Sequence, residues 1–487
     1  MSCARKHPTN VRVLIGGAGI GGLTLAALLE KAGIEYRVFE RAKEVKPLGS
    51  ALSIGANVMP LFEQLGILEE VLRNAKPFPF STGYNERREA TRTLDYSPAE
   101  KIGGYLPHII SRPVLYNILE RLVPRNKVLM SKKILSLQQN NEGVLIRCSD
   151  NTSYHGEILI GADGAYSAVR QSLYKALHQD GELPKSDNVS LPFNSTCLVG
   201  QTQPLSPDML PHMKDWHSWF ETTIGENKPY AWVTFTTKFN TICWMVLRHL
   251  DDKVSRELDS SFRNTEWGPE AAETMCKEVR DFPVPRGSLT IGDLIDATPK
   301  ELISKVMLEE KLFDTWYGGR TCLIGDACHK MYPSAGLGAV SAIQDAVVIA
   351  NCIYELPDDP TVEDITRVFQ NYQNERYPLA KTAYDTSHRL ASIVGQHWYN
   401  DIIRAMMKHM PKSVFTRSLQ VMYAYRPQAS FLDPVEDRGQ IKPEPQPSLK
   451  RARSRRDAEA SARHQMSASS ASVSAAPVCE KEYAQAI

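Results

Sequence analysis

The stretch VRVLIGGAGIGGLTLAALLEKAGIEYRVFER, residues 11–41, has the pattern of a strand, a glycine-rich turn, a helix and a second strand that ends in an acid. The apolar and mostly β-branched residues Val11, Val13, Leu14 and Ile15 are typical of a buried parallel strand. A helix is predicted from Leu23 to Lys31, and Tyr36–Phe39 is the predicted second strand. This order is that of a dinucleotide-binding βαβ unit, so it predicts an α/β fold with a Rossmann-like domain.

Three glycines in this stretch indicate what the turn binds. Gly17, Gly19 and Gly22 have the spacing G-x-G-x-x-G, in which the glycines serve a tight turn, backbone approach to a pyrophosphate, and packing of helix on strand. The helix start presents free N–H groups and a positive dipole end to phosphates. Glu40 follows Gly17 by 23 residues, where a carboxylate can accept the hydroxyls of an unphosphorylated adenosine ribose. We therefore expect a bound adenine dinucleotide.

Composition excludes several other classes. The chain has 487 residues and a net charge of +1, which gives no case for binding nucleic acid. Nine cysteines without a C-x-x-C pair argue against a disulfide framework and against a metal site, so we expect no metal and a reduced, cytoplasmic protein. No apolar run reaches the roughly 18 residues that span a bilayer. The apolar and basic segment 397–425 is expected to form helices on the body, with a peripheral membrane contact as the alternative.

The rest of the chain divides into regions that differ in composition and in hydrophobic pattern. Short strands at Ile134–Leu137, Val144–Cys148 and Ile158–Ile160 predict a β-meander. Aromatic-rich strands after Pro184 predict a mixed-sheet substrate domain, and C-terminal helices are expected near 362–377 and 382–394. The predicted regions are a discontinuous cofactor domain (10–183 and 287–360), a substrate domain (184–286), a C-terminal helical region (361–439) and a disordered tail (440–487) without apolar periodicity.

Two further motifs follow predicted strands and open helices. Gly161-Ala162-Asp163-Gly164 comes first, and Gly325-Asp326-Ala327-Cys328-His329 leads through a glycine-rich segment into a helix from Val340. With these motifs in this order, residues 10 to 395 resemble the FAD-dependent monooxygenases of the para-hydroxybenzoate hydroxylase type, the group A class. Within this class, the sequence is similar in its general character to fungal enzymes of secondary metabolism.

The resemblance implies roles for individual residues. The acid Asp326 would bind the ribityl chain of FAD, and the backbone of the glycine-rich segment would face the flavin ring. Arg112 would lie beside the dinucleotide at the start of a helix, and Asp163 is associated with FAD and with transient NADPH or NADH. The cofactor-binding residues expected in this way are Gly17, Gly19, Gly22, Glu40, Arg112, Asp163, Asp326, Gly336, Gly338 and Ala339.

Some positions leave the roles open. The family pattern G-x-G-x-N reads Gly336-Leu337-Gly338-Ala339-Val340 here, so the asparagine is absent. Arg170 can be either a surface ion pair or a cofactor contact, and His329 is at least as readily structural as functional. No catalytic side chain can be assigned from the sequence.

The expected reaction is the insertion of one oxygen atom from dioxygen into a small molecule. The segment Tyr230–Trp244 contains Trp232, Phe235, Phe239, Ile242 and Trp244 but only Lys238 as an ionisable side chain. This favours epoxidation or hydroxylation of an apolar natural product, such as a terpenoid or prenylated compound, over hydroxylation of a phenol, which benefits from a base. The alternatives are an aromatic hydroxylase of the same family and a non-catalytic flavin-binding protein.

Overall fold

The structure, a computed structural model, describes residues 12–45, 51–189, 191–208, 210–226, 228–250, 269–391, 405 and 409–454. Its first unit is the predicted one. Strand β1 (Val13–Gly16) is fully buried, helix α1 (Ile20–Ala32) follows at once, and β2 (Tyr36–Phe39) has the predicted bounds. Strand β1 pairs in parallel with β2, as a βαβ unit requires.

The main sheet has six strands in the order β19-β20-β12-β1-β2-β8. Its further strands are β8 (Val128–Leu129), β12 (Ile158–Gly161), β19 (Tyr317–Gly318) and β20 (Thr321–Leu323). The parallel register places Gly16 beside Gly161 and Gly161 beside Leu323. The three sequence motifs begin at or within two residues of these positions, so they start at the same edge of the sheet.

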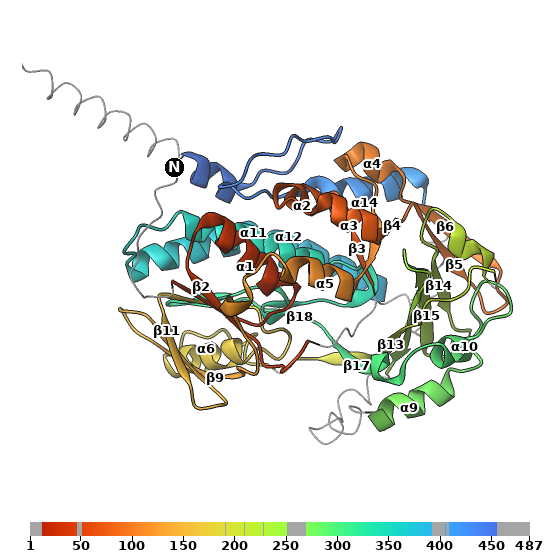
Figure 1. Cartoon of the computed structure of the whole chain (residues 1–487), viewed down its shortest axis with the longest axis horizontal. Helices are drawn as coiled ribbons and strands as arrows, with labels where there is room; N and C mark the ends of the chain where they lie inside the picture. Colours follow the sequence, from red (N-terminus) through yellow and green to blue (C-terminus); the bar gives the residue numbers. More distant parts are fainter. Residues whose placement is uncertain are drawn as a thin grey trace, which may run out of the picture.

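Helices cover this sheet on both faces (Figure 1). Helix α11 (Gly338–Tyr354) packs on α1 and on α12 (Val362–Ala391), while α6 (Ala168–Gln179) lies on the other side beside the meander. The remaining helices of this part are α2 (Met59–Gln64), α3 (Leu68–Asn74), α4 (Pro98–Gly103), α5 (Arg112–Glu120) and α14 (Lys412–Ala424). Small sheets complete it: β3 (Ala51–Ile54), β7 (His108–Ser111) and β4 (Ala75–Pro77) in one, β18 (Lys311–Leu312) and β21 (His329–Lys330) in another.

The predicted β-meander is present with one strand exchanged. It consists of β9 (Ile134–Gln139), β10 (Val144–Cys148) and β11 (Ser153–Gly156). The expected third strand, Ile158–Ile160, is instead the buried strand β12 of the main sheet. The prediction failed because β11 is short, polar and mostly exposed, so it carries no hydrophobic signal.

A second sheet of seven strands lies beside the first part, in the order β17-β13-β16-β15-β14-β5-β6 (Figure 1). Its strands are β5 (Phe80–Tyr84), β6 (Ala90–Asp95), β13 (Phe193–Gln201), β14 (Phe220–Ile224), β15 (Tyr230–Thr236), β16 (Ile242–His249) and β17 (Ser304–Glu309). Residues 184–286 thus supply four strands, whereas three come from outside the predicted substrate domain. Helices α9 (Pro269–Glu278) and α10 (Ile291–Asp296) cover one face of this sheet.

Helix α12 is one helix of 30 residues, where two were predicted. Pro378 lies within it and removes one backbone donor. The helix continues because its buried side chains on both sides of this proline, such as Tyr372 and Ala380, belong to the main apolar core. Tertiary packing has here overridden a local helix-breaking signal.

The prediction of disorder from residue 440 is wrong for residues 440–454. The backbone N–H and the hydroxyl of Ser448 both donate to the carboxylate of Glu375 on α12, at 2.7 and 3.1 Å, and Tyr425 donates to the same carboxylate at 2.8 Å. Arg451 forms an ion pair with Glu355. Polar contacts of this kind have no apolar periodicity, so the sequence pattern did not reveal them. The tail from 455 to 487 and most of 392–408 lie outside the described residues.

No helix in the described ranges has the length and hydrophobicity needed to cross a bilayer.

Truncation after Gly439 should lower the thermal midpoint of the purified protein by several degrees, because the buried Glu375 would lose the two hydrogen bonds from Ser448. Truncation after Ser454 is the matched control, since it keeps these contacts and should leave the midpoint unchanged. Both are measured by differential scanning fluorimetry, together with flavin content. Equal midpoints for the two truncations would contradict a structural role for residues 440–454.

Candidate functional site

The three motif glycines, two in the turn between β1 and α1 and one at the start of α1, have different surroundings. Gly17 has a φ of +100°, and a Cβ built on it would lie 2.5 Å from the carbonyl oxygen of Ala162. A Cβ on Gly22 would lie 2.1 Å from the carbonyl oxygen of Gly17, whereas a Cβ on Gly19 would meet nothing within 4 Å. The fold therefore requires the first and third glycines, and the second borders open space. A pyrophosphate fits this cradle, next to the helix N-terminus.

The carboxylate of Glu40 lies over the same turn. It accepts hydrogen bonds from the backbone N–H of Ala18 and of Ala42, both at 2.9 Å. These bonds hold the acid at the end of β2 beside the first turn of the motif. A carboxylate oxygen also has capacity for a further donor, such as a ribose hydroxyl.

The second motif has a structural task. Asp163 follows β12, and one of its carboxylate oxygens accepts from the backbone N–H of Ala168 and Val169 at the start of α6. Burial raises the pKa of Asp163. Its backbone also supports the first motif, because a Cβ on Gly17 would lie 2.8 Å from the Cα of Asp163. Its assignment as a cofactor contact stays a prediction.

Arg170 is not the surface ion pair that was one of its two expected roles, and its role as a cofactor contact stays a prediction. It is buried and donates to the carbonyl oxygens of Ala165 and Ala327, at 2.7 and 2.8 Å. Its guanidinium also lies 4.3 Å from the ring centre of Phe313. Arg170 thus ties the second motif to the third.

The third motif carries Asp326 on a short 3-10 turn, Gly325–Ala327, directly after β20. Asp326 forms an ion pair with Lys330, with 2.8 Å between Oδ2 and Nζ. Arg112, at the first position of α5, is mostly buried and lies close enough for its charge to interact with Asp326. Burial lowers the pKa of the Arg112 guanidinium, and Asp326 opposes that shift. The fold thus brings together Arg112 and Asp326, which were each predicted to bind the cofactor.

The glycine-rich segment joins this group through its backbone. Gly336, with a φ of +65°, ends the short turn Pro333–Ala335, and α11 begins at Gly338 and Ala339. A Cβ on Gly338 would lie 3.9 Å from Oδ1 of Asp326. Val340, in place of the family asparagine, is buried in the main core, so this segment can offer backbone N–H groups without that side chain.

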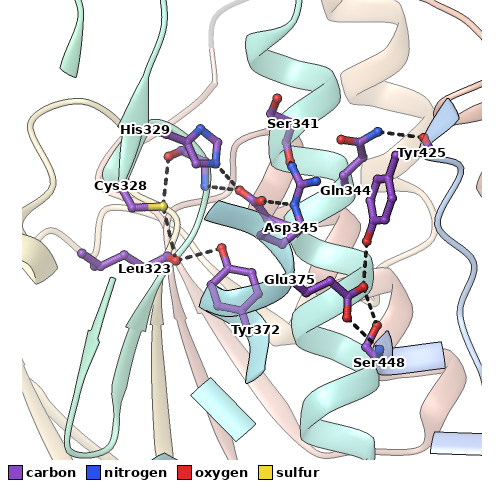
Figure 2. Close-up of polar contacts among 12 residues, drawn as sticks. Leu323, Cys328, His329, Ser341, Gln344, Asp345, Tyr372, Glu375, Tyr425 and Ser448 are labelled. Atoms are coloured by element: carbon purple, nitrogen blue, oxygen red, sulfur yellow. Dashed lines mark hydrogen bonds and ion pairs between the residues drawn. The ribbon is translucent and has the colours of Figure 1, made fainter. Parts of the chain in front are cut away.

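His329 belongs to a buried network under the site (Figure 2). Its Nε2 bonds to the carboxylate of Asp345, which also accepts from the backbone N–H of Gly325 at 2.9 Å and from Arg376 at 2.7 Å. The ligand atoms of Cys328, His329 and Asp345 lie within 4.8 Å of one another, which is a spacing that a metal ion could use. The guanidinium of Arg376 already neutralises this carboxylate, so we interpret the group as a structural network.

Sequence reasoning missed Lys330, Glu309 and Tyr166. The spacing of Lys330, four residues after Asp326, was the available signal. Glu309 and Tyr166 are distant in sequence, and only the fold brings the Tyr166 hydroxyl to the Glu309 carboxylate. Cys322 and Cys328, on either side of the start of the third motif, are both buried and free.

Comparison with known proteins agrees with this geometry. The family described as FAD binding domain matches residues 10–215 and 241–387. The chain is 30% identical over 391 residues to the FAD-dependent monooxygenase ptmM of Penicillium ochrochloron, covering 78% of this chain and 87% of that protein. It is 29% identical over 398 residues to the FAD-dependent monooxygenase paxM of Penicillium paxilli, covering 78% of each.

Solved structures share the fold. The structure of Klebsiella pneumoniae HpxO complexed with FAD and uric acid superposes with a TM-score of 0.67 at 18% identity, covering 85% of this chain and 97% of that one. Since the family match extends over most of the sequence, the chain belongs to the FAD binding domain family. It is an FAD-dependent monooxygenase with FAD as its cofactor, which confirms the resemblance seen in the motifs.

Replacing Gly19 by Val should yield folded protein with little or no FAD. The backbone at Gly19 is extended, with φ −74° and ψ −176°, and the space around it is open, so valine fits the chain but would occupy the phosphate cradle. Gly22→Ala is the contrasting variant, because its Cβ would collide with Gly17 and should destabilise the fold itself. Flavin absorbance per protein and the thermal midpoint of the apoprotein separate the two. Normal FAD content in Gly19→Val would show that the phosphates lie elsewhere.

Proposed function

We propose that this monooxygenase inserts one oxygen atom from dioxygen into a large apolar natural product, by epoxidation or hydroxylation, with NADPH or NADH as transient reductant. When bound, FAD would pass electrons from NADPH or NADH to dioxygen and so provide the activated oxygen. The protein must hold the substrate close and exclude water. The observation that carries the proposal is the chemical character of one face of the seven-stranded sheet.

That face, named here the inner face, is the one opposite α9 and α10. Most of its buried side chains are apolar, and these cluster with Tyr332, which precedes the glycine-rich segment: Cys197, Val199, Val233, Phe235, Cys243, Leu247 and Leu308. The inner face is thus next to the segment that we propose contacts the flavin ring. An apolar substrate between them would meet both.

A row of aromatic rings extends from the inner face. Phe235 stacks on Phe220 with 5.3 Å between ring centres, and Phe220 lies 5.1 Å from Phe78. Tyr96 continues the row at 4.7 Å from Phe78, and Phe415 of α14 lies 5.1 Å from Tyr96. Such a row offers an apolar ligand a long contact surface, which suits a terpenoid or prenylated skeleton.

Two tryptophans that entered the sequence argument lie on the opposite face. Trp232 and Trp244 are buried beneath α9 and α10, where their indole N–H groups donate to the Pro283 carbonyl and to the Thr298 hydroxyl. They are core residues because strand alternation directs neighbouring side chains to opposite faces. Of the aromatic residues in Tyr230–Trp244 used for that argument, Phe235 belongs to the inner-face cluster.

A second candidate function is hydroxylation of an aromatic substrate. Strand alternation places His249, at the end of β16, on the same side as Leu247. Its Nδ1 lies 3.4 Å from the Ser195 hydroxyl. An imidazole here is the kind of base that a phenol hydroxylase uses. The apolar character of the rest of the inner face favours the first candidate.

For the cofactor we propose that Glu40 binds the adenosine ribose, that Gly17, Gly19 and Gly22 form the phosphate turn, and that Asp326 binds the ribityl chain. The geometry that supports these roles is the open space at Gly19 and the orientation of Asp326 toward Gly338. We further propose that Arg112 and Asp163 border the dinucleotide, and that Gly336, Gly338 and Ala339 face the flavin ring. The sequence has no second G-x-G-x-x-G, so the nicotinamide would bind without a dinucleotide fold of its own.

We also propose a cytoplasmic protein. The exposed Val414 and Val421 of α14 mark where a peripheral membrane contact would form.

Asp326→Ala should weaken FAD binding about 10- to 100-fold, because a charge-assisted hydrogen bond contributes roughly 1.5 to 3 kcal/mol. Excess FAD should then restore part of the activity. The dissociation constant is measured by titrating the apoprotein and following flavin fluorescence. An unchanged constant would refute the proposed role of this acid.

The substrate proposal is tested by supplying the purified enzyme with NADPH, one panel of simple phenols and one panel of prenylated or terpenoid olefins. We expect an oxygenated olefin, detected as a mass increase of one oxygen atom by mass spectrometry. Product is measured instead of NADPH loss, because uncoupled turnover releases peroxide. Stoichiometric hydroxylation of a phenol without any product from an olefin would favour the second candidate function.

A further inference from the structure

Lys330 is a partly buried cation beside the acid of the third motif. It lies on β21, four residues after Asp326, and its Nζ is 2.8 Å from Oδ2 of that carboxylate. Asp326 raises the pKa of Lys330 although burial acts in the opposite direction. A lysine in this position stays charged and is held by a group that the proposed cofactor site needs.

The ion pair leaves the two oxygens of Asp326 with different surroundings. Oδ2 bonds to Lys330, whereas Oδ1 is on the side of Gly338, where a Cβ would lie 3.9 Å from it. A free aspartate can rotate about its side-chain bonds, and a cation on one oxygen restricts that rotation. The contact with Lys330 therefore directs Oδ1 toward the glycine-rich segment.

Lys330 is supported from the second sheet as well. Glu309, the last residue of β17, is buried, and its charge interacts with that of Lys330. Burial raises the pKa of Glu309 to about 7, and Lys330 opposes this rise. The hydroxyl of Tyr166, in the loop after the second motif, donates to Glu309. On the other side, the charge of Arg112 interacts with both Lys330 and Asp326.

From this arrangement we propose that Lys330 is a positioning residue for FAD: it orients the carboxylate of Asp326 for the cofactor and is itself braced by Glu309 and Tyr166. The inference rests on the proposed role of Asp326. It assigns Lys330 no contact with FAD and no part in oxygen transfer. Its effect on the cofactor should pass entirely through Asp326.

A double-mutant cycle tests this dependence. Apoproteins of wild type, Lys330→Met, Asp326→Asn and the double variant are titrated with FAD, and the dissociation constants are compared. We expect Lys330→Met to weaken FAD binding roughly tenfold, and the double variant to bind no more weakly than Asp326→Asn alone, because coupled neighbours are non-additive. Lys330→Arg keeps a cation and should remain within about threefold of wild type.

Lys381→Met is the matched control. Lys381 forms an ion pair with Asp385 at the same spacing and the same 2.8 Å distance, on the exposed part of α12. Its loss should leave FAD affinity unchanged. Thermal midpoints of the apoproteins show whether each variant folds, and Lys330→Gln replaces Lys330→Met if that variant does not, with a smaller loss and the same non-additivity expected.

The outcomes separate the two proposals. If Asp326→Asn weakens binding and the Lys330 variant does not, the role of Lys330 is refuted and that of Asp326 stands. If neither weakens binding, the proposed role of Asp326 is refuted. Additive losses would show that Lys330 acts on FAD independently of Asp326, which also overturns the positioning role, as would Lys330→Arg binding as weakly as Lys330→Met.

Discussion

The position of the third motif depends on one buried carboxylate. Asp345 of α11 is fully buried and bonds to the N–H of Gly325, to His329 and to Arg376 of α12 (Figure 2). Burial acts to raise the pKa of Asp345, but His329 and Arg376 lower it below its ordinary value. The acid thus stays ionised. Removing one partner of such a buried pair typically costs about 3 to 5 kcal/mol, because the other charge is left without compensation.

This network fixes the beginning of the turn and leaves its next residue available. Gly325 and His329 are bound from the side of α11 and α12, whereas Asp326 between them is partly exposed and faces Lys330. The parallel sheet adds a second constraint, because its register places the ends of β1, β12 and β20 side by side. Ligands of open α/β sheets bind at this edge. Motifs that are far apart in sequence thereby form one site.

The sequence predicted the features that a local pattern encodes. The turn at Gly17 and Gly22 is one, since both glycines are needed by contacts within the βαβ unit or its neighbouring strand. The position of β2 is another, since its bounds match the predicted ones. Each of these depends on residue type and short-range spacing, which the sequence shows directly.

The predictions that failed concern features that depend on contacts between residues far apart in the sequence. Strand β5 joins the second sheet by pairing in parallel with β14, more than a hundred residues later, and nothing in its composition marks that partner. The sequence showed the alternation of side chains along β15 and β16. It did not show which face of the sheet the helices would cover, so it could not place Trp232 and Trp244 on one face or the other. Residues 440–454 were misjudged because hydrogen bonds to Glu375, and not an apolar stripe, hold them.

The joint between the two sheets is built differently from the face proposed to bind substrate. At the end of β17, Glu309 is directed to Tyr166 and Lys330, and the next residue, Glu310, bonds to His388 of α12 at 2.6 Å. Both acids are buried, so charged groups with specific partners set this junction, whereas the inner face is mostly apolar. Apolar residues of similar size exchange at modest cost, but a buried charge requires its partner. If the inner face binds the substrate as proposed, substitutions there would change the substrate while the junction keeps the sheet in place beside the proposed cofactor site.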